Sequence, residues 1–463
     1  MRRWIAQSLA AAALTTLSIA AAPAQAFCGF YVAKADGALF NEASKVVMMR
    51  DGRRTVITMA NDYQGEAKDF AMVIPTPVSL SREQINVAES ALIDHLDAYT
   101  APRLVEYYDP DPCGLIAQQR RLSTMQNTLS AGAADAFREK ARTLGVEIEA
   151  EYTVGEYDIF ILSAKESGGL QTWLNANGYR TPDGAAPVLA SYIAQGMKFF
   201  VAKVNLAEQA KRGGQFLRPL QIAFESDKFM LPIRLGTVNA KGKQDLLLFT
   251  LTRSGRVETA NYPTRRIPSD LDIPLYVQER FGAFYKAMFD TAVTRAGGRA
   301  VFTEYAWDMA WCDPCAADPL SARQLRKLGV FWVKERATPR PPIGGTRRQS
   351  GAQDVFVTRL HVRYDAATFP EDLRLMETGD RRNFQGRYVT RHPFAGQSEC
   401  PAREEYLKAK ARAHERQAQT LATLTGWDIT EIRETMRASG QATTGAGGLE
   451  GQPEWWREIW NDG

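Results

Sequence analysis

"KVVMMRDGRRTVITMAND" (Lys45–Asp62) decides the fold, because two apolar-rich runs flank Asp51-Gly52. Asp-Gly readily takes the positive φ angles of a type I′ turn, so the pattern predicts a β-hairpin. A third strand is predicted at "FAMVIP" (Phe70–Pro75), where proline ends the apolar run. The first part of the chain is therefore expected to be antiparallel sheet.

Helical patterns follow this hairpin. A helix is predicted from Ser81 as N-cap, with Ile85, Ala88, Leu92 and Leu96 forming one apolar stripe. Further strands are predicted within 157–164, 197–206, 220–262, 299–307, 355–364 and 386–394, and further helices at 168–179, 186–196 and 275–295. This order indicates an α+β fold with mostly antiparallel strands and interspersed short helices.

The C-terminal tail is predicted to be helical. Pro401 suits the first turn of a helix, and Glu404 and Lys408 are spaced as a favourable i,i+4 pair. A second tail helix is expected to begin with Asp428 and Glu431 in capping-box positions.

The N-terminus has the pattern of a signal peptide. Arg2 and Arg3 precede an apolar run, and Ala24-Gln25-Ala26 supplies the small residues that signal peptidase requires. Cleavage after Ala26 is predicted, which gives an exported protein, periplasmic or extracellular, that is soluble once the leader is removed. An uncleaved membrane anchor is the alternative. No later segment approaches the roughly eighteen apolar residues of a spanning helix.

Length and charge limit the domain organisation and the partners. The chain has 463 residues, and its 57 basic and 53 acidic side chains give a formal net charge of +4. This balance does not indicate a nucleic-acid partner. With the hydrophilic stretch 207–215 as a boundary, the expected organisation has five parts: a signal peptide (1–26), two α+β domains (27–210 and 216–400), a helical tail (401–439) and a flexible linker with an aromatic end (440–463).

All five cysteines lie after the predicted cleavage site, in a compartment that permits disulfides. The candidates for a structural disulfide framework are Cys28, Cys113, Cys312, Cys315 and Cys400. Sequence leaves the pairing open. We hypothesise a Cys28–Cys113 bond, because it would hold the mature N-terminus to a proline-stiffened turn.

Two other uses of the cysteines remain open. Cys312-Asp-Pro-Cys315 is a possible redox pair, but Asp313 disfavours a neighbouring thiolate, and Asp318-Pro319 is predicted to start the next helix beyond the motif. A zinc site is the other alternative. Its ligands are Cys312, Cys315, His392 and Cys400.

No catalytic motif or cofactor site is evident. The sequence contains no H-E-x-x-H, no G-x-S-x-G and no phosphate-binding loop. His95 lies between Asp94 and Asp97, where a solvated helix face is expected rather than a catalytic pair. Asp109 and Asp111 could bind calcium, but a proline-stiffened turn explains them better.

Five stretches, taken together and in order, resemble one bacterial family. They are "FCGFYVAKADGALFNEAS", "TMANDYQG", "DHLDAYTAPRLVEYYDPDPC", "EYAWDMAWCDPCAADPLS" and "RHPF". The family is domain of unknown function 2330. The resemblance implies an exported bacterial envelope protein and adds no activity.

The sequence therefore favours a non-enzymatic binding or interaction module of the envelope, stapled by disulfides, with an unknown envelope component as partner and no cofactor. The basic loop Arg336–Gln353 and the tail Trp455–Trp460 are candidate contact segments, although the tail could instead pack on its own domain. The alternative is an exported thiol–disulfide oxidoreductase that uses Cys312 and Cys315.

Overall fold

The structure is a computed structural model. It describes residues 30–33, 40–64, 70–113, 146–165, 167–176, 181–205, 207–208, 211, 217–238, 240, 242–311, 313, 318–334, 353–396 and 400–441. Within these ranges no helix combines the length and the apolar character needed to cross a membrane.

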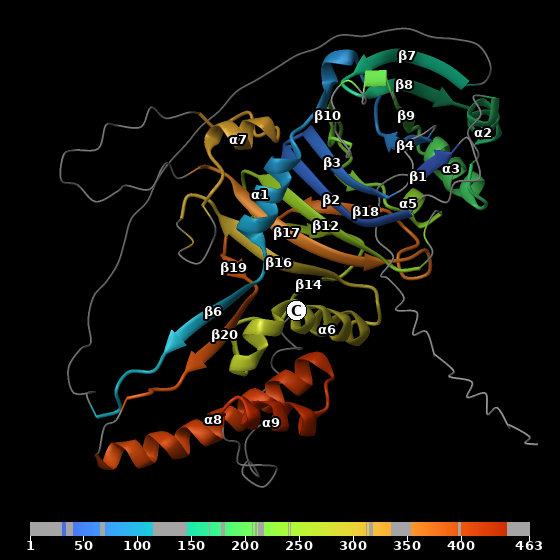
Figure 1. Cartoon of the computed structure of the whole chain (residues 1–463). Helices are drawn as coiled ribbons and strands as arrows, with labels where there is room; N and C mark the ends of the chain where they lie inside the picture. The colour runs from blue at the N-terminus through green and yellow to red at the C-terminus, as the bar shows by residue number, and fades with distance from the viewer. Residues whose placement is uncertain are drawn as a thin grey trace, which may run out of the picture.

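The largest sheet of the described residues has nine strands, and the predicted hairpin is part of its centre (Figure 1). β2 and β3 pair antiparallel around Gly52, whose φ of +60° is the left-handed conformation that an Asp-Gly turn requires. β12 pairs parallel with β2 and antiparallel with β17. In spatial order the strands are β14 (Thr264–Arg266), β16 (Val301–Asp308), β17 (Phe356–Tyr364), β12 (Gln244–Thr252), β2 (Phe40–Asp51), β3 (Arg54–Gln64), β10 (Leu220–Glu225) and β5 (Ile85–Val87), with β19 (Phe384–Gln385) paired to β16.

A five-stranded sheet packs against one face of the nine-stranded sheet. Val46 and Met48 point into the core between the two sheets, while Val47 and Met49 point to the opposite face, as the alternation of a strand requires. The five strands, in spatial order, are β1 (Phe30–Ala33), β4 (Phe70–Thr76), β9 (Lys198–Val204), β8 (Tyr157–Ala164) and β7 (Val146–Val154).

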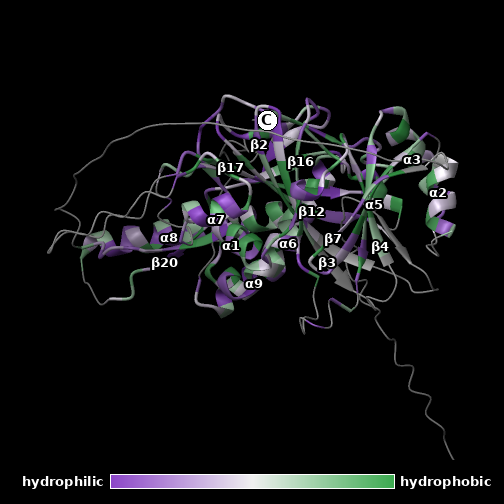
Figure 2. Cartoon of the chain, turned by 90° about the horizontal axis from the view of Figure 1, so that it is seen from above, coloured by the Kyte–Doolittle hydropathy of each residue, from purple (hydrophilic) through white to green (hydrophobic). Residues whose placement is uncertain are grey.

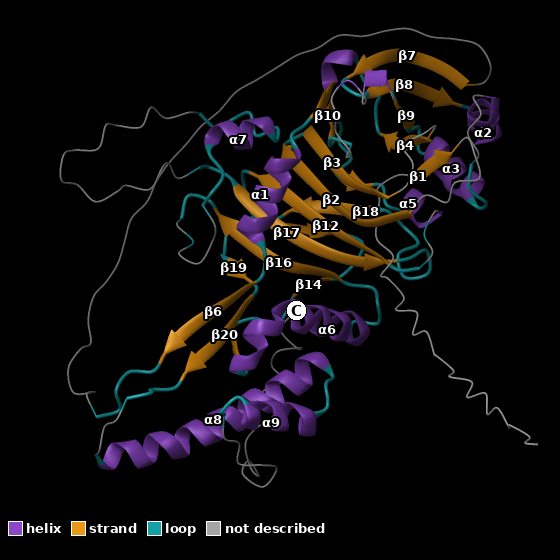
Figure 3. Cartoon of the chain, in the orientation of Figure 1, coloured by secondary structure: helices purple, strands orange, loops and turns teal. Residues whose placement is uncertain are grey.

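Helices cover the outer faces of both sheets, which gives an α/β/β/α order of layers (Figure 3). The five-stranded sheet is covered by α2 (Ser167–Ala176) and α3 (Ala185–Ala194). The nine-stranded sheet is covered by α1 (Ser90–Thr100) and α7 (Ala322–Lys327), and farther along by α6 (Phe281–Arg295), which follows the 3₁₀ helix η2 (Leu275–Arg280).

An arm extends from this body. It consists of residues 103–113, 387–396 and 400–410, which include the parallel pair β6 (Arg103–Tyr108) and β20 (Arg387–His392) and the start of α8 (Pro401–Thr425). The short β15 (Leu271–Asp272) pairs with β20. The end of α8 and the whole of α9 (Ile429–Ala438) pack against α6. Figure 2 shows hydrophobic residues along the central strands and a mixture of hydrophilic and hydrophobic residues along α8.

A last small sheet lies near α5 (Arg234–Val238). Its strands, in spatial order, are β11 (Met230–Leu231), β18 (Leu373–Glu377) and β13 (Val257–Thr259).

The α+β class and the helical tail are confirmed. Pro401 begins α8, the Glu404 and Lys408 side chains are 2.7 Å apart, and the Asp428 side chain caps α9. The expected domains 27–210 and 216–400 contribute strands to the same nine-stranded sheet, so the stretch 207–215 does not separate two sheets.

Three local predictions are wrong. Ser81 caps only the 3₁₀ helix η1 (Arg82–Gln84), and the next residues form β5, because they pair with β10; the helix starts at Ser90. Ser321, not Asp318, caps α7, because Gln324 completes its capping box. Residues 234–236, expected at the end of the strand "FMLPIRLG" (229–236), instead begin α5.

Candidate functional site

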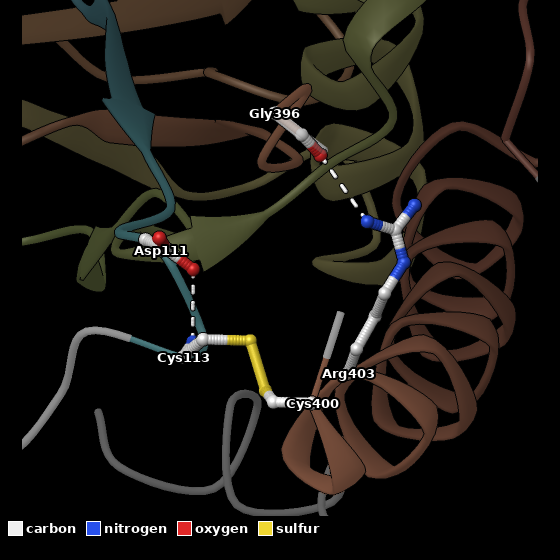
Figure 4. Close-up of a disulfide and its surroundings, with 5 residues drawn as sticks. All are labelled: Asp111, Cys113, Gly396, Cys400 and Arg403. Carbon is white, nitrogen blue, oxygen red and sulfur yellow. Dashed lines mark hydrogen bonds between the residues drawn. A yellow bond between two sulfur atoms is a disulfide. The ribbon is translucent and has the colours of Figure 1, made fainter. Parts of the chain in front are cut away.

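A disulfide joins Cys113 to Cys400 in the arm (Figure 4). Their Cα atoms are 6.1 Å apart, although 287 positions separate them in the sequence. The Asp111 carboxylate accepts a hydrogen bond from the Cys113 amide at 2.9 Å, and Arg403 donates to the Gly396 carbonyl at 3.2 Å. The bond ties the segment after β6 to the residue that precedes α8.

The hypothesised Cys28–Cys113 bond is therefore wrong. Parallel pairing of β6 with β20 carries both strands toward the same end, so the residues that follow them meet there. The same bond removes Cys400 from the alternative zinc set. His392, also in that set, stacks on Tyr108 and lies 2.8 Å from the Glu106 carboxylate.

Several predicted site residues lie outside the described residues, so those predictions stay untested. They are Ala26, Cys28, Cys312, Cys315, residues 336–352 and Trp455–Trp460. Asp109 accepts a hydrogen bond from Tyr406 at 2.8 Å and pairs with Lys410, so within the arm it fixes the start of α8 to the segment after β6. The described residues contain no group of three or more His, Cys, Asp or Glu side chains that could hold a metal.

A charged network lies buried on the helix-covered face of the nine-stranded sheet. Glu304 is the residue at a β-bulge in β16, which turns its carboxylate toward β17. One carboxylate oxygen lies 2.6 Å from Nδ1 of His361 and also accepts from Tyr285, while the other accepts from Nε of Arg359 at 2.5 Å.

The network continues in two directions. Arg359 pairs with Asp97 on α1, whose other carboxylate oxygen is 2.7 Å from Lys45. On the far side, Nε2 of His361 is 3.5 Å from Asp245, which Arg363 contacts at 2.7 Å. Side chains from β2, α1, β16, β17 and β12 therefore meet in one chain of alternating charge.

The neighbouring charges determine the protonation of this network. Burial would raise the pKa of Glu304, but the positive charges of His361 and Arg359 outweigh it and hold that pKa at about 2. Burial likewise opposes ionisation of Asp245, yet hydrogen bonds from His361 and Arg363 lower its pKa to about 2. Burial would lower the pKa of His361, and the Glu304 charge and hydrogen bonds from Asp245 and Glu304 raise it instead.

The network resembles an acid–base centre in composition but is closed to a substrate. Glu304 is fully buried, and the Phe289 ring of α6 stacks on His361 with 3.7 Å between ring centroids. General acid–base catalysis requires contact with the reacting group. The role that this geometry supports is structural, since each buried charge has a partner of opposite sign.

An open cleft of about 470 Å³ lies elsewhere, among residues at or next to α3, α5, β11 and β18. Its lining residues are Gln195, Lys228, Phe229, Met230, Arg234, Glu371, Asp372 and Arg374. Arg234 opens α5, and Met230 and Arg374 face each other across the β11–β18 pair.

Hydrogen bonds hold the polar groups of the cleft. Asp372 is buried and accepts from the Tyr192 hydroxyl at 2.6 Å and from the Ile233 amide at 2.9 Å. Arg234 donates to the Ser191 hydroxyl at 2.7 Å and lies over the Tyr192 ring. The cleft is therefore lined by side chains with defined positions.

Sequence reasoning missed both groups. The histidine and three acids of the network, His361, Glu304, Asp97 and Asp245, belong to four separate elements, and only the folded chain brings them together.

His95, expected on a solvated face, is half-buried, and its ring nitrogens contact the Asp318 carbonyl at 2.7 Å and Gln324 at 3.0 Å. For the cleft, the only signal was the basic and apolar mixture in "DKFMLPIR", residues 227–234.

Comparison with known proteins gives one match. Residues 22–376 match a family described as "Uncharacterized protein conserved in bacteria (DUF2330)". No curated protein and no solved structure matches the chain.

Proposed function

The chain belongs to the DUF2330 family of bacterial proteins, and we propose that it is an exported, disulfide-stapled binding protein of the envelope that captures a small ligand without transforming it. The cleft between α3, α5 and β18 is the binding site in this proposal.

The cleft is the observation that carries the proposal. Its volume of about 470 Å³ falls within the range of small-molecule sites, roughly 300–1,000 Å³. Its lining combines two apolar side chains, Phe229 and Met230, with six polar or charged side chains. Polar groups that converge on one space fix the orientation of a bound small molecule.

Export is supported by the signal-peptide pattern and agrees with the Cys113–Cys400 bond, since disulfides persist in oxidising compartments. N-terminal sequencing of the protein from bacterial culture is expected to begin at Phe27. A sequence that begins at Met1 would refute the export proposal without affecting the cleft.

A ligand screen tests the binding function. Small molecules would be screened by ligand-observed NMR against the full chain and against Gln195→Trp, which places an indole in the cleft from an exposed position. Lys286→Trp, an exposed change on α6, is the matched control. We expect ligands that bind the wild type and Lys286→Trp but not Gln195→Trp.

Mass spectrometry of the same samples tests the non-enzymatic part. Ligands recovered unchanged after long incubation support a binding protein. Binding that Gln195→Trp leaves intact, or conversion of a bound ligand to product, contradicts the proposal.

The oxidoreductase alternative rests on Cys312 and Cys315, which lie outside the described residues.

A further inference from the structure

We propose that the cleft takes an oxyanion, a carboxylate or phosphate group on a small molecule with an apolar portion, and that Lys228 and Arg234 bind its charge. This inference rests on the binding function proposed above and deepens it by naming the ligand class.

Neither cation forms an ion pair within 4.0 Å with a carboxylate of the described residues, although the charge of Arg234 acts on the nearby Asp372. The ammonium of Lys228 contacts only the Gln195 carbonyl, at 3.1 Å, and Arg234 donates to the neutral Ser191 hydroxyl. Most donors of the Arg234 guanidinium therefore stay available to a ligand.

The acids that line the cleft are already occupied. The Glu371 carboxylate lies 2.8 Å from the Arg374 guanidinium and neutralises its charge. Oδ1 of Asp372 accepts hydrogen bonds from Tyr192, Ile233 and the Arg234 amide. Burial raises the pKa of Asp372, and this effect outweighs those hydrogen bonds and the Arg234 charge, so its ionised form is less favoured than that of an ordinary aspartate.

A third cation lies behind the apolar wall. The Arg50 guanidinium stands over the Phe229 ring, 5.1 Å from its centroid, and donates to the Thr55 hydroxyl at 2.6 Å. No carboxylate of the described residues is within ion-pair distance of Arg50 either. Arg50 does not line the cleft, but its charge lies behind Phe229, and Phe229 and Met230 supply a surface for an apolar portion.

The chemistry follows from this arrangement. A guanidinium presents paired donors that match the two oxygens of a carboxylate or phosphate, and a lysine adds a point charge. A cationic ligand would meet the like charges of Lys228 and Arg234, and a neutral ligand would leave both without an ion pair. The cleft is therefore selective for an anion.

Saturation-transfer NMR with matched six-carbon probes tests the charge preference. Hexanoate and hexyl phosphate carry the oxyanion, 1-hexanol is neutral and hexylamine is cationic. We expect the wild type to bind hexanoate or hexyl phosphate at least tenfold more tightly than the other two. The stronger of the two anions identifies carboxylate or phosphate as the preferred group.

Charge-removing variants test the residues. Lys228→Gln and Arg234→Gln are each expected to weaken binding of the preferred anion about tenfold, while Lys286→Gln, which removes a distant exposed charge, leaves it unchanged. Circular dichroism verifies that each variant is folded. Equal binding of all four probes, no binding of any, or affinities unchanged in both cleft variants overturns the oxyanion site.

The two proposals fail in different ways. If the ligand screen finds neutral or cationic compounds that Gln195→Trp excludes, the cleft still binds small molecules and only the oxyanion assignment fails. If Gln195→Trp excludes nothing, the binding function fails with it.

Discussion

Cys113 and Cys400 are joined across 287 positions, so one covalent bond closes the arm between the segment after β6 and the start of α8. Replacing either residue by serine is expected to lower the free energy of unfolding by up to about 5–6 kcal/mol in the chain-entropy account of disulfides. The double variant should lose little more than either single variant, since both remove the same bond. Denaturant titration measures all three.

A peptide map under non-reducing conditions provides the control for this prediction. Cys113 and Cys400 should appear in one disulfide-linked peptide pair. A map that joins Cys28 to Cys113, or losses that add up in the double variant, would contradict the bond.

Glu304 is the centre of the buried network, and its neutralisation is expected to be costly. Glu304→Gln leaves Arg359 and His361 buried without their shared carboxylate, a change that typically costs about 3–5 kcal/mol. Glu404→Gln is the matched control, because Glu404 pairs with Lys408 at the surface and should matter by less than about 1 kcal/mol. Similar losses in the free energy of unfolding for both variants would show that the buried network contributes no more stability than a surface ion pair.

Acid should destabilise the protein through the same network. The folded-state pKa values of Glu304 and Asp245 are about 2, below their ordinary values of 4.5 and 3.8. A lowered pKa contributes stability that is present above the ordinary value and is lost as pH falls through the folded value. The unfolding midpoint in denaturant should therefore fall between about pH 4.5 and pH 2, and less steeply in Glu304→Gln.

His361 predicts the opposite dependence at higher pH. Its pKa is raised above the ordinary value of 6.5, so the stability that it contributes is complete below that value and is lost as pH rises through the folded value. Unfolding midpoints of the wild type should decline with rising pH above about 6.5, and those of His361→Gln should not. Parallel pH profiles for the two proteins would show that His361 is not charged in the folded state.

Local patterns predicted local structure well. Asp51-Gly52 dictates a turn whatever surrounds it, and Gly297-Gly298 end α6 through positive φ angles of 65° and 72°. The helix predicted from the apolar stripe at Ile85 was wrong at its start. Its first residues pair with β10, more than a hundred positions away, and no local sequence pattern indicates such a pairing. Tertiary contacts overrode the helical period there.

The candidate site depended on contacts between distant segments. Nothing near Cys113 in sequence indicates Cys400, because the parallel pairing of β6 and β20 decides that proximity. Arg234 is the first residue of α5 and Asp372 precedes β18, and these two residues, 138 positions apart, meet only in the folded chain. The sequence indicated that disulfides would form, and the structure has one, whereas no sequence pattern indicated the cleft.

The most direct test of the oxyanion cleft is to locate a bound carboxylate. A small nitroxide that carries a carboxylate would be titrated into isotope-labelled full chain, and paramagnetic broadening of assigned backbone amides recorded. The account predicts selective broadening at Met230, Arg234 and Arg374, abolished in the Lys228→Gln, Arg234→Gln double variant. Broadening centred on another part of the molecule, or spread evenly over its surface, would contradict it.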